Sequence, residues 1–580
     1  MSYKILPQIT QSDRKNLNKY SDILAHLLYH RGFKDVRSAE EFLNINYELN
    51  SGDPFLLKDI QIATDRIFQA IFENQKICIY SDYDADGIPG AVILSDFFDK
   101  INFKNFFVYI PHRNREGFGL NFSAIKKITE EKANLIITID CGITDVDQIE
   151  KAVLSGIDVI VTDHHDPNDH VSKALAVINP KQKDCKYSDK NICGSGVIFK
   201  VVQALILKGR EKILKDENFI LKDNWPNIGW EKWLLDMVGI ATLSDMVPLV
   251  GENRIFAKYG LLVMRKSPRK GFRRLLKECK IDQNLIVEDD VGFSISPRIN
   301  AASRMGEPEI AYKMLFTKDD HEAELTVKHL HKINDERKGV VASMVKEIKK
   351  DFKEMDFSNK KIIVKGNPNW SPSLLGLAAS NIVETYNKPV FLWGRGEGTD
   401  YKGSCRSNGE VNLVDLMNNV PDGIIGEYGG HMMAGGFVVK EKGIFDLDDG
   451  LQSAYEKVKN HDVESDFVVD AEITLEDINF NFFNEVQKLA PFGVGNEKPL
   501  FLLKNLRVDE VSYFGKEKKH LKLIFKKKDG KKISAIKFFA LEEKNMNEIK
   551  SGQNVDLLVN IEKSNFGRIT ELRLRIVDFM

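Results

Sequence analysis

Acidic and histidine side chains follow three apolar segments in the first third of the chain. The segments are ICIY (residues 77–80), ANLIITI (133–139) and GIDVIVT (156–162). The residues that come next are Asp82, Asp84 and Asp86; Asp140; and Asp163, His164 and His165. Three carboxylates within five residues repel one another, and this repulsion is costly unless a positive species lies among them. A cluster of divalent cations is the simplest such species.

The ligand types indicate which metal would bind. Aspartate oxygens with one or two imidazoles and no cysteine suit Mn²⁺ or Mg²⁺ better than a structural zinc ion. Several carboxylates, some able to bridge, suit two ions better than one. Asp245, near the end of the apolar run LLDMVGIATLSDMVPL, is a further candidate ligand, although a helix-end role would also explain it. Each group alone has an ordinary alternative in a turn or a helix N-cap, so the repetition at three segment ends carries the hypothesis.

The three segments predict a particular kind of sheet. Together with a fourth apolar run, ALAVINP (174–180), they alternate with helical stretches such as residues 91–98. This alternation is typical of a parallel, doubly wound α/β sheet. The carboxyl ends of parallel strands line the ligand crevice of such a sheet. We therefore expect these sequence-distant side chains to meet at one edge.

Composition indicates a multidomain globular protein. The chain is 43% hydrophobic and 29% charged, which is ordinary for globular proteins. Its length of 580 residues corresponds to about three or four domains. The formal net charge is -2, so any nucleic-acid surface must be local. The six cysteines form no CxxC pair, the first residues lack a signal-peptide apolar region, and no apolar run is long enough to span a membrane. We expect a cytoplasmic protein with unpaired thiols, without membrane association.

The texture of the chain predicts five regions. They are an N-terminal helical segment (1–50), a catalytic α/β domain with a parallel sheet (51–260), a helical connector (261–355), a second α/β domain (356–455) and a C-terminal β-barrel (456–580). Residues 210–230 are polar and irregular and are predicted to be an insertion loop. Residues 321–352 predict a long helix that joins two domains, although a solvated surface helix would show the same pattern.

Four motifs, in order, resemble those of the DHH phosphoesterase superfamily. They are SDYDADG, TIDCG, VTDHH and ATLSDMVPL. The chain also resembles the RecJ branch of this superfamily from about residue 80 to 500, through EGFGL, VINPKQ, CGSGV, PRINAASRMG, KGSCRS, GGHMMAGG and LAPFGVGNEKPLF. The resemblance implies a DHH domain, a DHH-associated domain and an OB-fold. It also implies a single-strand-specific 5′ to 3′ DNA exonuclease of DNA repair and recombination, which uses two Mn²⁺ or Mg²⁺ ions and releases mononucleotides.

The resemblance also implies roles for individual residues. The metal ligands would be Asp84, Asp86, Asp140, His164 and Asp245, with Asp82 as a further ligand or a partner of one. His165 would face the scissile phosphate or orient ligands, so that His165, Asp140 and His164 carry the catalysis. Hydrolysis at two metal ions needs no covalent enzyme intermediate. The partners would be single-stranded DNA with a 5′ end, a helicase and a single-strand-binding protein, and the protein would be a monomer.

A second set of residues would hold the strand and its end. The substrate-binding candidates are Arg113, Arg298, Arg304, Ser404, Arg406, Gly429, Gly430 and His431. By the resemblance, Arg304, Ser404 and Arg406 bind the terminal 5′ phosphate, and an arginine fork suits phosphate oxygens. Each arginine could instead pair with an Asp or Glu, because 85 acidic residues balance 83 basic ones. His431 could instead be a packing residue beside a tight turn.

The C-terminal domain carries a basic stretch with aromatic residues interleaved. The proposed grip on the nucleic acid comprises Lys518, Lys519, Lys522 and Lys526. The aromatic residues are Phe514, His520, Phe525, Phe538 and Phe539. OB-folds bind single strands with such a combination of cations and stacking rings. The alternative is a solvated hairpin tip, with Phe525 in the core.

Two positions depart from the family pattern, and three other functions stay open. Ser371 follows Trp370 where RecJ-like proteins often carry His, and Ser303 stands where Gly is usual. The alternatives are a DHH-family nano-RNase or small-nucleotide phosphodiesterase, a type II pyrophosphatase, and a non-catalytic DNA-binding scaffold. The length of the chain and its basic C-terminal domain argue against the first two. The intact ligand set argues against the third.

Overall fold

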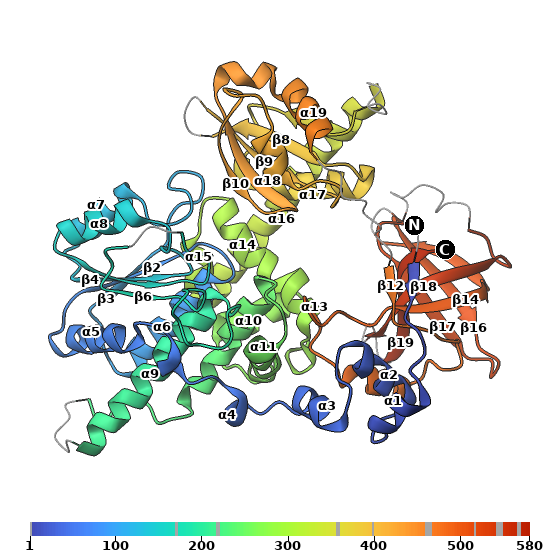
Figure 1. Cartoon of the computed structure of the whole chain (residues 1–580), viewed down its shortest axis with the longest axis horizontal. Helices are drawn as coiled ribbons and strands as arrows, with labels where there is room; N and C mark the ends of the chain where they lie inside the picture. Colours follow the sequence, from blue (N-terminus) through green and yellow to red (C-terminus); the bar gives the residue numbers. More distant parts are fainter. Residues whose placement is uncertain are drawn as a thin grey trace. The chain divides into compact units, whose positions relative to one another are not determined.

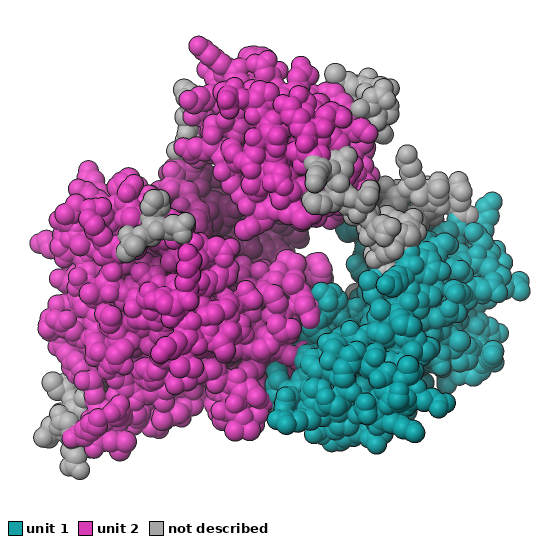
Figure 2. Space-filling view, in the orientation of Figure 1, with its two compact units in different colours: residues 1–45, 461–492, 496–580 teal, residues 46–460, 493–495 magenta. Residues whose placement is uncertain are grey.

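The chain folds into two compact units, each described here by itself. The computed structural model describes residues 3–168, 172–215, 221–354, 360–396, 400–458, 467–515, 518–540, 549–564 and 570–580. One unit comprises residues 1–45, 461–492 and 496–580, and the other residues 46–460 and 493–495 (Figure 2). In the described part of the chain no helix is long and apolar enough to cross a membrane.

A five-stranded parallel sheet forms the centre of the larger unit. Its order is β3-β2-β4-β5-β6, and all neighbours are parallel. The strands are β2 (Ile77–Ser81), β3 (Phe106–Tyr109), β4 (Leu135–Ile139), β5 (Asp158–Thr162) and β6 (Ala176–Ile178). Figure 1 shows α7 (Phe122–Glu130) and α8 (Val146–Leu154) over one face, with α5 (Ile60–Phe72), α6 (Gly87–Lys100) and α9 (Gly194–Lys215) over the other. The doubly wound parallel sheet predicted from the apolar runs is confirmed.

The register of the sheet brings the three ligand-bearing strands to the same level. Ser81 pairs with Ile139, and Ile139 pairs with Thr162. Each is the last residue of its strand, so the residues that follow it leave the sheet side by side. All residues of β2 and β4 are buried, as expected of strands that are covered on both faces.

Two details of this domain differ from the sequence interpretation. The edge strand β3 was not predicted, because its four half-buried residues give too short an apolar run. Residues 210–215 belong to α9 and not to an insertion loop, because REKILK lacks helix breakers and continues the preceding helix. Residues 216–220 lie outside the described part of the chain. Beyond them, Trp225 is buried and stacks on Phe68, so the segment is anchored to the domain.

A helical region follows the sheet and ends in one long helix. It contains α10 (Leu235–Ser244), α11 (Gly251–Met264), α12 (Lys270–Glu278), α13 (Glu288–Asp290), the π-helical turn η4 (Val291–Ile295), α14 (Ser296–Arg304), α15 (Glu309–Phe316) and α16 (Asp320–Glu354). The predicted long helix is α16. It packs first against α12, α14 and α15 and then against α17 of the next domain, so it joins two domains and is not a solvated surface helix.

The second α/β domain contains a mixed five-stranded sheet. Its order is β10-β11-β9-β8-β7, in which only β7 and β8 are parallel. The elements are β7 (Ile363–Gly366), α17 (Pro372–Tyr386), β8 (Val390–Arg395), β9 (Tyr401–Arg406), α18 (Leu413–Asn418), β10 (Ile425–Gly430), β11 (Ala434–Val439) and α19 (Leu447–Lys457). The α/β start of this domain was predicted, whereas its three antiparallel strands were not, because glycine-rich β9, β10 and β11 lack a clear apolar alternation.

The smaller unit combines the two ends of the chain. Its helices are α1 (Gln11–Asn16), α2 (Asp22–His30), α3 (Val36–Leu43) and α20 (Phe480–Gln487). Its main sheet has the order β13-β14-β18-β19-β17-β16-β15, and a separate parallel pair joins β1 (Tyr3–Ile5) to β12 (Phe467–Val469). The strands of the main sheet are β13 (Ala471–Glu472), β14 (Phe501–Arg507), β15 (Glu510–Phe514), β16 (His520–Lys526), β17 (Lys532–Lys537), β18 (Asn554–Ser564) and β19 (Glu571–Phe579). Helix α2 contributes Leu24 and Leu28 to the same hydrophobic core as Phe501 and Phe525, so the N-terminal helices are part of this unit.

A buried ion network fixes two helices that lead to the strand ends. Arg269 Nε donates to Asp236 Oδ2 on α10 at 2.8 Å, and its Nη2 lies 2.6 Å from Asp96 Oδ2 on α6. Ser267 Oγ also donates to Asp236 Oδ2, at 2.7 Å. Burial alone would lower the pKa of Arg269, but the two carboxylates raise it above the usual value. Arg269 therefore holds α6 and α10 at a fixed separation.

We predict that Arg269→Met destabilises the larger unit by about 3–5 kcal/mol, because it leaves two buried carboxylates without a counter-charge. Thermal and urea unfolding followed by circular dichroism would measure this loss. Lys328→Met removes an exposed i,i+4 ion pair with Glu324 on α16 and is the matched control, expected to change stability by less than about 0.5 kcal/mol. Equal stability of the two variants would contradict the role given to Arg269.

Candidate metal centre

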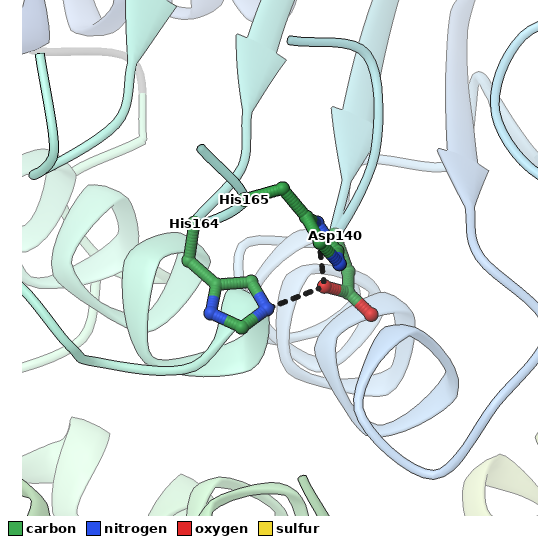
Figure 3. A group of neighbouring side chains, drawn as sticks. All are labelled: Asp140, His164 and His165. Carbon is green, nitrogen blue, oxygen red and sulfur yellow. Dashed lines mark ion pairs between the residues drawn. The ribbon is translucent and has the colours of Figure 1, made fainter. Parts of the chain in front are cut away.

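Seven acidic and histidine side chains meet at the carboxyl ends of β2, β4 and β5. Three groups have ligand atoms that all lie within 4.8 Å of one another: Asp140, His164 and His165; Asp86, His164 and Asp245; and Asp82, Asp84 and Asp140. The groups share members, so they form one continuous cluster. The structure thus brings together the six residues proposed as metal ligands and His165. Figure 3 shows the histidine pair facing Asp140.

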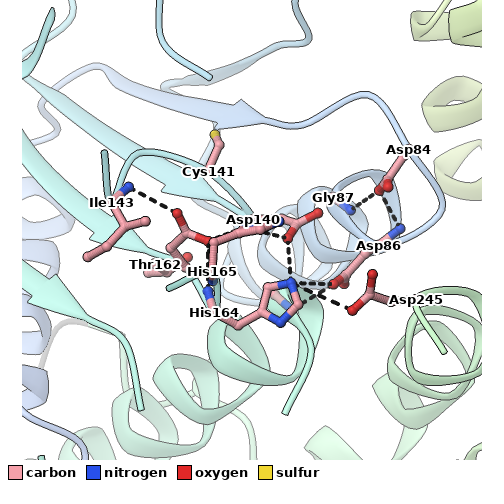
Figure 4. Close-up of polar contacts among 12 residues, drawn as sticks. Asp84, Asp86, Gly87, Asp140, Cys141, Ile143, Thr162, His164, His165 and Asp245 are labelled. Carbon is pink, nitrogen blue, oxygen red and sulfur yellow. Dashed lines mark hydrogen bonds and ion pairs between the residues drawn. The ribbon is translucent and has the colours of Figure 1, made fainter. Parts of the chain in front are cut away.

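Backbone amides at two helix starts hold the first acidic motif. Asp84 Oδ1 accepts hydrogen bonds from the amides of Asp86 (2.8 Å) and Gly87 (3.1 Å), where α6 begins (Figure 4). The carboxylate of Asp86 accepts from the amides of Gly194 and Ser195, both at 2.7 Å, where α9 begins. A helix N-terminus favours negative charge, so α6 and α9 both stabilise aspartates of the cluster.

The backbone around Asp140 is unusual and depends on a neighbouring glycine. Asp140 has φ of 62°, a left-handed conformation that is uncommon for a residue with a side chain. A Cβ at Gly194 would lie 2.6 Å from both Cβ and Oδ1 of Asp140, so only glycine fits there. Strained backbone of this kind persists where the surroundings fix it, and it is concentrated at functional sites.

Asp163, the acid that precedes the two histidines, orients His165. Its Oδ1 accepts from the amides of His164 (2.7 Å) and His165 (3.1 Å) and lies 2.8 Å from His165 Nδ1. Its Oδ2 accepts from the amide of Ile143 at 2.9 Å. Burial would raise the pKa of Asp163, but these hydrogen bonds and the imidazole lower it overall. No separate role was predicted for Asp163, although its place directly before the two histidines was the available signal in the sequence.

Burial and mutual repulsion raise the pKa values of several acids. Burial, followed by the charge of Asp84, raises the pKa of Asp86 to about 6. Burial and the charges of Asp86 and Asp84 raise that of Asp245 to about 8. The pKa values of Asp82 and Asp140 are also raised, mainly by burial. The protein alone therefore supplies too little positive charge to keep all of these carboxylates ionised.

The two histidines differ in charge state. Burial and the neighbouring His165 lower the pKa of His164 to about 4, so its imidazole is neutral at pH 7 and has a lone pair for a metal. Burial would lower the pKa of His165 as well, but its hydrogen bond to Asp163 raises it to about 9. His165 is thus cationic at neutral pH.

Unpartnered buried atoms show that the cluster fits a cation. Asp82 Oδ1, Asp140 Oδ1 and His164 Nε2 are buried and make no hydrogen bond. His164 Nε2 lies 3.2 Å from Asp140 Oδ1, 3.6 Å from Asp245 Oδ2 and 3.8 Å from Asp86 Oδ2. Buried polar atoms without partners are costly, and hard oxygen ligands with one imidazole suit Mn²⁺ or Mg²⁺. The donor set therefore fits divalent metal ions.

The arginines proposed to hold substrate lie in the same unit as this cluster. Arg113 lies 4.8 Å over the ring of Tyr83, within the first acidic motif. Arg304 Nη1 donates to the Ser373 carbonyl at 2.6 Å, so α14 is tied to the second α/β domain. Burial and the charges of Arg113, Arg337 and Arg406 lower the pKa of Arg304 to about 9. These guanidinium groups are therefore close together.

The alternative that each arginine pairs with an acid is not supported in the described residues. There, no Asp or Glu forms an ion pair with Arg113, Arg298, Arg304 or Arg406. Arg406 Nη1 donates to the Cys405 carbonyl (2.7 Å) and Ser404 Oγ (3.2 Å), while Arg298 Nη1 donates to the Ser294 carbonyl (2.7 Å). Neutral partners leave the positive charges uncompensated, which suits an anionic ligand.

The glycine motif GGHMMAGG forms a hairpin beside β9. Gly429 and Gly430 end β10, and Gly435 and Gly436 pair with them from β11. A Cβ at Gly430 would lie 2.4 Å from the Ala434 carbonyl, so this turn requires glycine. His431 is exposed in the turn, and only its amide is bonded, to the Ala434 carbonyl at 2.8 Å. It is therefore not a packing residue.

In the smaller unit, one face of β16 carries the proposed cationic grip. Lys522 and Lys526 alternate with the buried residues Leu521, Leu523 and Phe525, so they face solvent. Phe525 belongs to the hydrophobic core, so the alternative to a stacking role is confirmed for this residue. Lys518 is exposed and Lys519 is half-buried in the turn before β16. The rings of Phe514, His520, Phe538 and Phe539 form a separate cluster, and Arg575 lies 4.0 Å over Phe538.

Comparison with known proteins identifies the three folded parts. Residues 76–223 match the model of the DHH family, N-terminal domain, residues 359–460 that of the DHHA1 domain, and residues 469–578 that of the RecJ OB domain. The Escherichia coli protein named single-stranded-DNA-specific exonuclease RecJ is 30% identical over 75% of this chain and 76% of its own. The chain belongs to the RecJ family. The Bacillus subtilis RecJ is 35% identical over 86% of this chain, and the match spans 61% of that relative's length.

A solved RecJ structure has the same fold. The crystal structure of Thermus thermophilus RecJ in complex with Mn²⁺ matches with a TM-score of 0.80 and 25% identity, over all of this chain and 79% of that one. Of the two RecJ positions that depart from the usual pattern, Ser303 is buried and donates to the Asn300 carbonyl at 3.2 Å. Ser371 Oγ lies 3.0 Å from Ser373 Oγ, next to the Arg304 contact.

One further residue supports the RecJ motif and was not proposed from the sequence. Asn300 on α14 accepts at Oδ1 from the amide of Ala85, at 2.9 Å, across 215 residues of sequence. It thereby holds the loop between Asp84 and Asp86 in place. Its position inside the motif PRINAASRMG was the only signal in the sequence, because the contact itself is long-range.

We predict that Gly194→Ala weakens Mn²⁺ binding about 10- to 100-fold, since the added methyl group displaces Asp140 and the amide that holds Asp86. Isothermal titration calorimetry of the purified protein would measure the affinity, with circular dichroism as the check on folding. Gly339→Ala on α16, where a Cβ meets nothing within 4 Å, is the control and should bind Mn²⁺ like the wild type. Unchanged affinity in folded Gly194→Ala would refute this account of the cluster.

Proposed function

We propose that this protein is a metal-dependent exodeoxyribonuclease that degrades single-stranded DNA from its 5′ end and releases mononucleotides. The observation that carries the proposal is the cluster in which Asp140 and His164 each belong to two groups of metal-type ligands, with buried atoms that make no hydrogen bond. Membership of the RecJ family and the three matched domains support it. The ligands proposed for two Mn²⁺ or Mg²⁺ ions are Asp82, Asp84, Asp86, Asp140, His164 and Asp245.

The residues of the centre divide the chemical work. When bound, the two ions supply Lewis acidity to the phosphoryl group and make water more acidic. Asp140 and His164 each belong to two of the three ligand groups, so each could contact more than one ion. His165 is cationic and fixed through Nδ1 by Asp163, so its Nε2–H is free to donate to a phosphoryl oxygen as negative charge develops. The chain needs no nucleophilic side chain, so no covalent intermediate forms on the protein.

Recognition of the 5′ end is assigned to the uncompensated arginines. Arg304 and Arg406, with Ser404, would hold the terminal phosphate, because their charges lack acidic partners and their groups lie close together. Arg113 and Arg298, with Gly429, Gly430 and His431, would contact the strand nearby. An endonuclease acts within a strand and has no need for such an end-binding set.

The smaller unit is proposed as a second contact with the strand. Lys522 and Lys526 on β16, with Lys518 and Lys519, would follow the phosphate backbone, and the exposed ring of Phe539 would stack on bases. In a cell, a helicase would supply single strands and a single-strand-binding protein would cover them. The protein is proposed to act as a monomer in DNA repair and recombination.

The reaction and its polarity can be tested with the wild type and one variant. Mononucleotides should be released from the 5′ end of single-stranded DNA with Mn²⁺, and a blunt duplex should resist. Strands labelled at either end and resolved on gels would show this polarity. Asp140→Ala should lower cleavage by at least about 10³-fold, because it removes a ligand common to two groups, while strand binding in EDTA stays within about threefold. Cleavage of only dinucleotides would instead indicate a nano-RNase, and binding without cleavage by the wild type would indicate a scaffold.

We predict that Arg406→Gln removes the preference for a 5′ phosphate. A charged hydrogen bond to phosphate contributes about 1.5–3 kcal/mol, so kcat/KM on 5′-phosphorylated strands should fall about 10- to 100-fold. The same variant should cleave strands with a 5′ hydroxyl nearly as fast as the wild type. Arg395→Gln on β8, which removes an exposed ion pair with Glu441, is the control. Equal losses on both kinds of strand would contradict the assignment of Arg406.

A further inference from the structure

Within the part of the chain that the structure describes, one arginine on the long helix α16 forms no ion pair with an acid and is not among the substrate-binding candidates. Arg337 lies near the middle of α16, and its buried Nε makes no hydrogen bond. The lysines of the same helix behave differently. Lys328, Lys332 and Lys338 each pair with an acid three or four residues away. Among the described residues, no carboxylate forms such a pair with Arg337.

Arg337 extends the group of uncompensated arginines toward α14. Burial lowers its pKa, the charge of Arg298 lowers it further, and the charge of Asp335 on the same helix offsets part of this decrease. The charge of Arg337 in turn contributes to the lowered pKa of Arg304. Helix α14, which carries Arg298 and Arg304, packs against α16, and Arg298 Nε lies 3.4 Å from His331 Nδ1 on α16. The positive groups therefore continue from β9 past Arg304 to Arg337 and Arg298.

The same side of α16 contains a second polar group without a partner. Asn334 precedes Arg337 by three residues, so the two side chains lie on adjacent turns of one helix face. Asn334 is completely buried, and neither its Oδ1 nor its Nδ2 makes a hydrogen bond. An unpaired buried amide is costly, as is an unpaired buried guanidinium nitrogen. Two such groups side by side are not explained by packing, because an arginine kept only for packing would bond a carbonyl or a carboxylate.

We propose that Arg337 binds an internal phosphate of the substrate strand, next to Arg298. The terminal phosphate already has Arg304, Arg406 and Ser404, so Arg337 is available for another phosphate of the strand. This inference rests on the proposed exonuclease function and adds a strand-holding residue to it.

A double-mutant cycle with modified DNA tests the contact directly. Arg337→Gln would be assayed on 5′-phosphorylated single strands in which one internal phosphate at a time is replaced by an uncharged methylphosphonate. On unmodified strands kcat/KM should fall about 10- to 100-fold, the loss typical of one charge-assisted contact. At one linkage, the methylphosphonate should slow the wild type by a similar factor and should not slow Arg337→Gln further. Lys332→Gln, which removes a charge from another face of α16, should behave like the wild type at every linkage.

Each other outcome has a definite meaning. Additive losses at all linkages would show that Arg337 touches no internal phosphate and would overturn the proposal. A loss that disappears on strands with a 5′ hydroxyl would assign Arg337 to the terminal phosphate and would also overturn it. Arg337→Lys retains the charge and should recover part of the activity, and it replaces Arg337→Gln in the cycle if that variant does not fold. If the wild type degrades no DNA, the proposed function fails, and the same strands would then test the contact through fluorescence anisotropy in EDTA.

Discussion

The repulsion among buried carboxylates at the ends of three adjacent strands is the constraint on which the larger unit depends. Asp82, Asp86 and Asp140 are buried, and both burial and the charges of neighbouring aspartates raise their pKa values. The fold answers part of this cost with backbone amides at the starts of α6 and α9. The remaining repulsion is left for cations to offset, since several ligand atoms make no hydrogen bond within the protein. The left-handed backbone at Asp140 and the glycine at position 194 follow from bringing these groups so close together.

Opposite charges are segregated within one unit rather than paired. The acids gather at the strand ends, whereas Arg113, Arg298, Arg304 and Arg406 use carbonyl, hydroxyl or ring partners and keep their charge for a ligand. A net charge of -2 conceals this arrangement, because the acids and bases of the chain nearly balance and many exposed lysines of the described residues pair with nearby acids. A polyanion could bind to the arginines and, through metal ions, to the acidic cluster at the same time.

The sequence predicted what depends on local pattern. Apolar runs predicted β2, β4, β5 and β6, and the order of residues after them predicted which side chains meet, because strand ends in a parallel sheet share one edge. It did not predict β3, β9, β10 or β11, which have short or glycine-rich patterns. Contacts between distant segments were equally inaccessible. The bond from Ala85 to Asn300 and the packing of α2 with the C-terminal strands depend on tertiary structure, and residue type alone does not reveal them.

The contact between Arg304 and the Ser373 carbonyl has a consequence for the length of the product. It ties α14, which also holds the first acidic motif through Asn300, to α17 of the second domain. Ser373 Oγ returns a hydrogen bond to the Arg304 carbonyl at 2.8 Å, so the tie is double. The distance from the arginines proposed to bind the 5′ end to the proposed metal ligands is therefore set by these two helices. In the proposed exonuclease, this fixed distance would determine how many nucleotides leave with each cut.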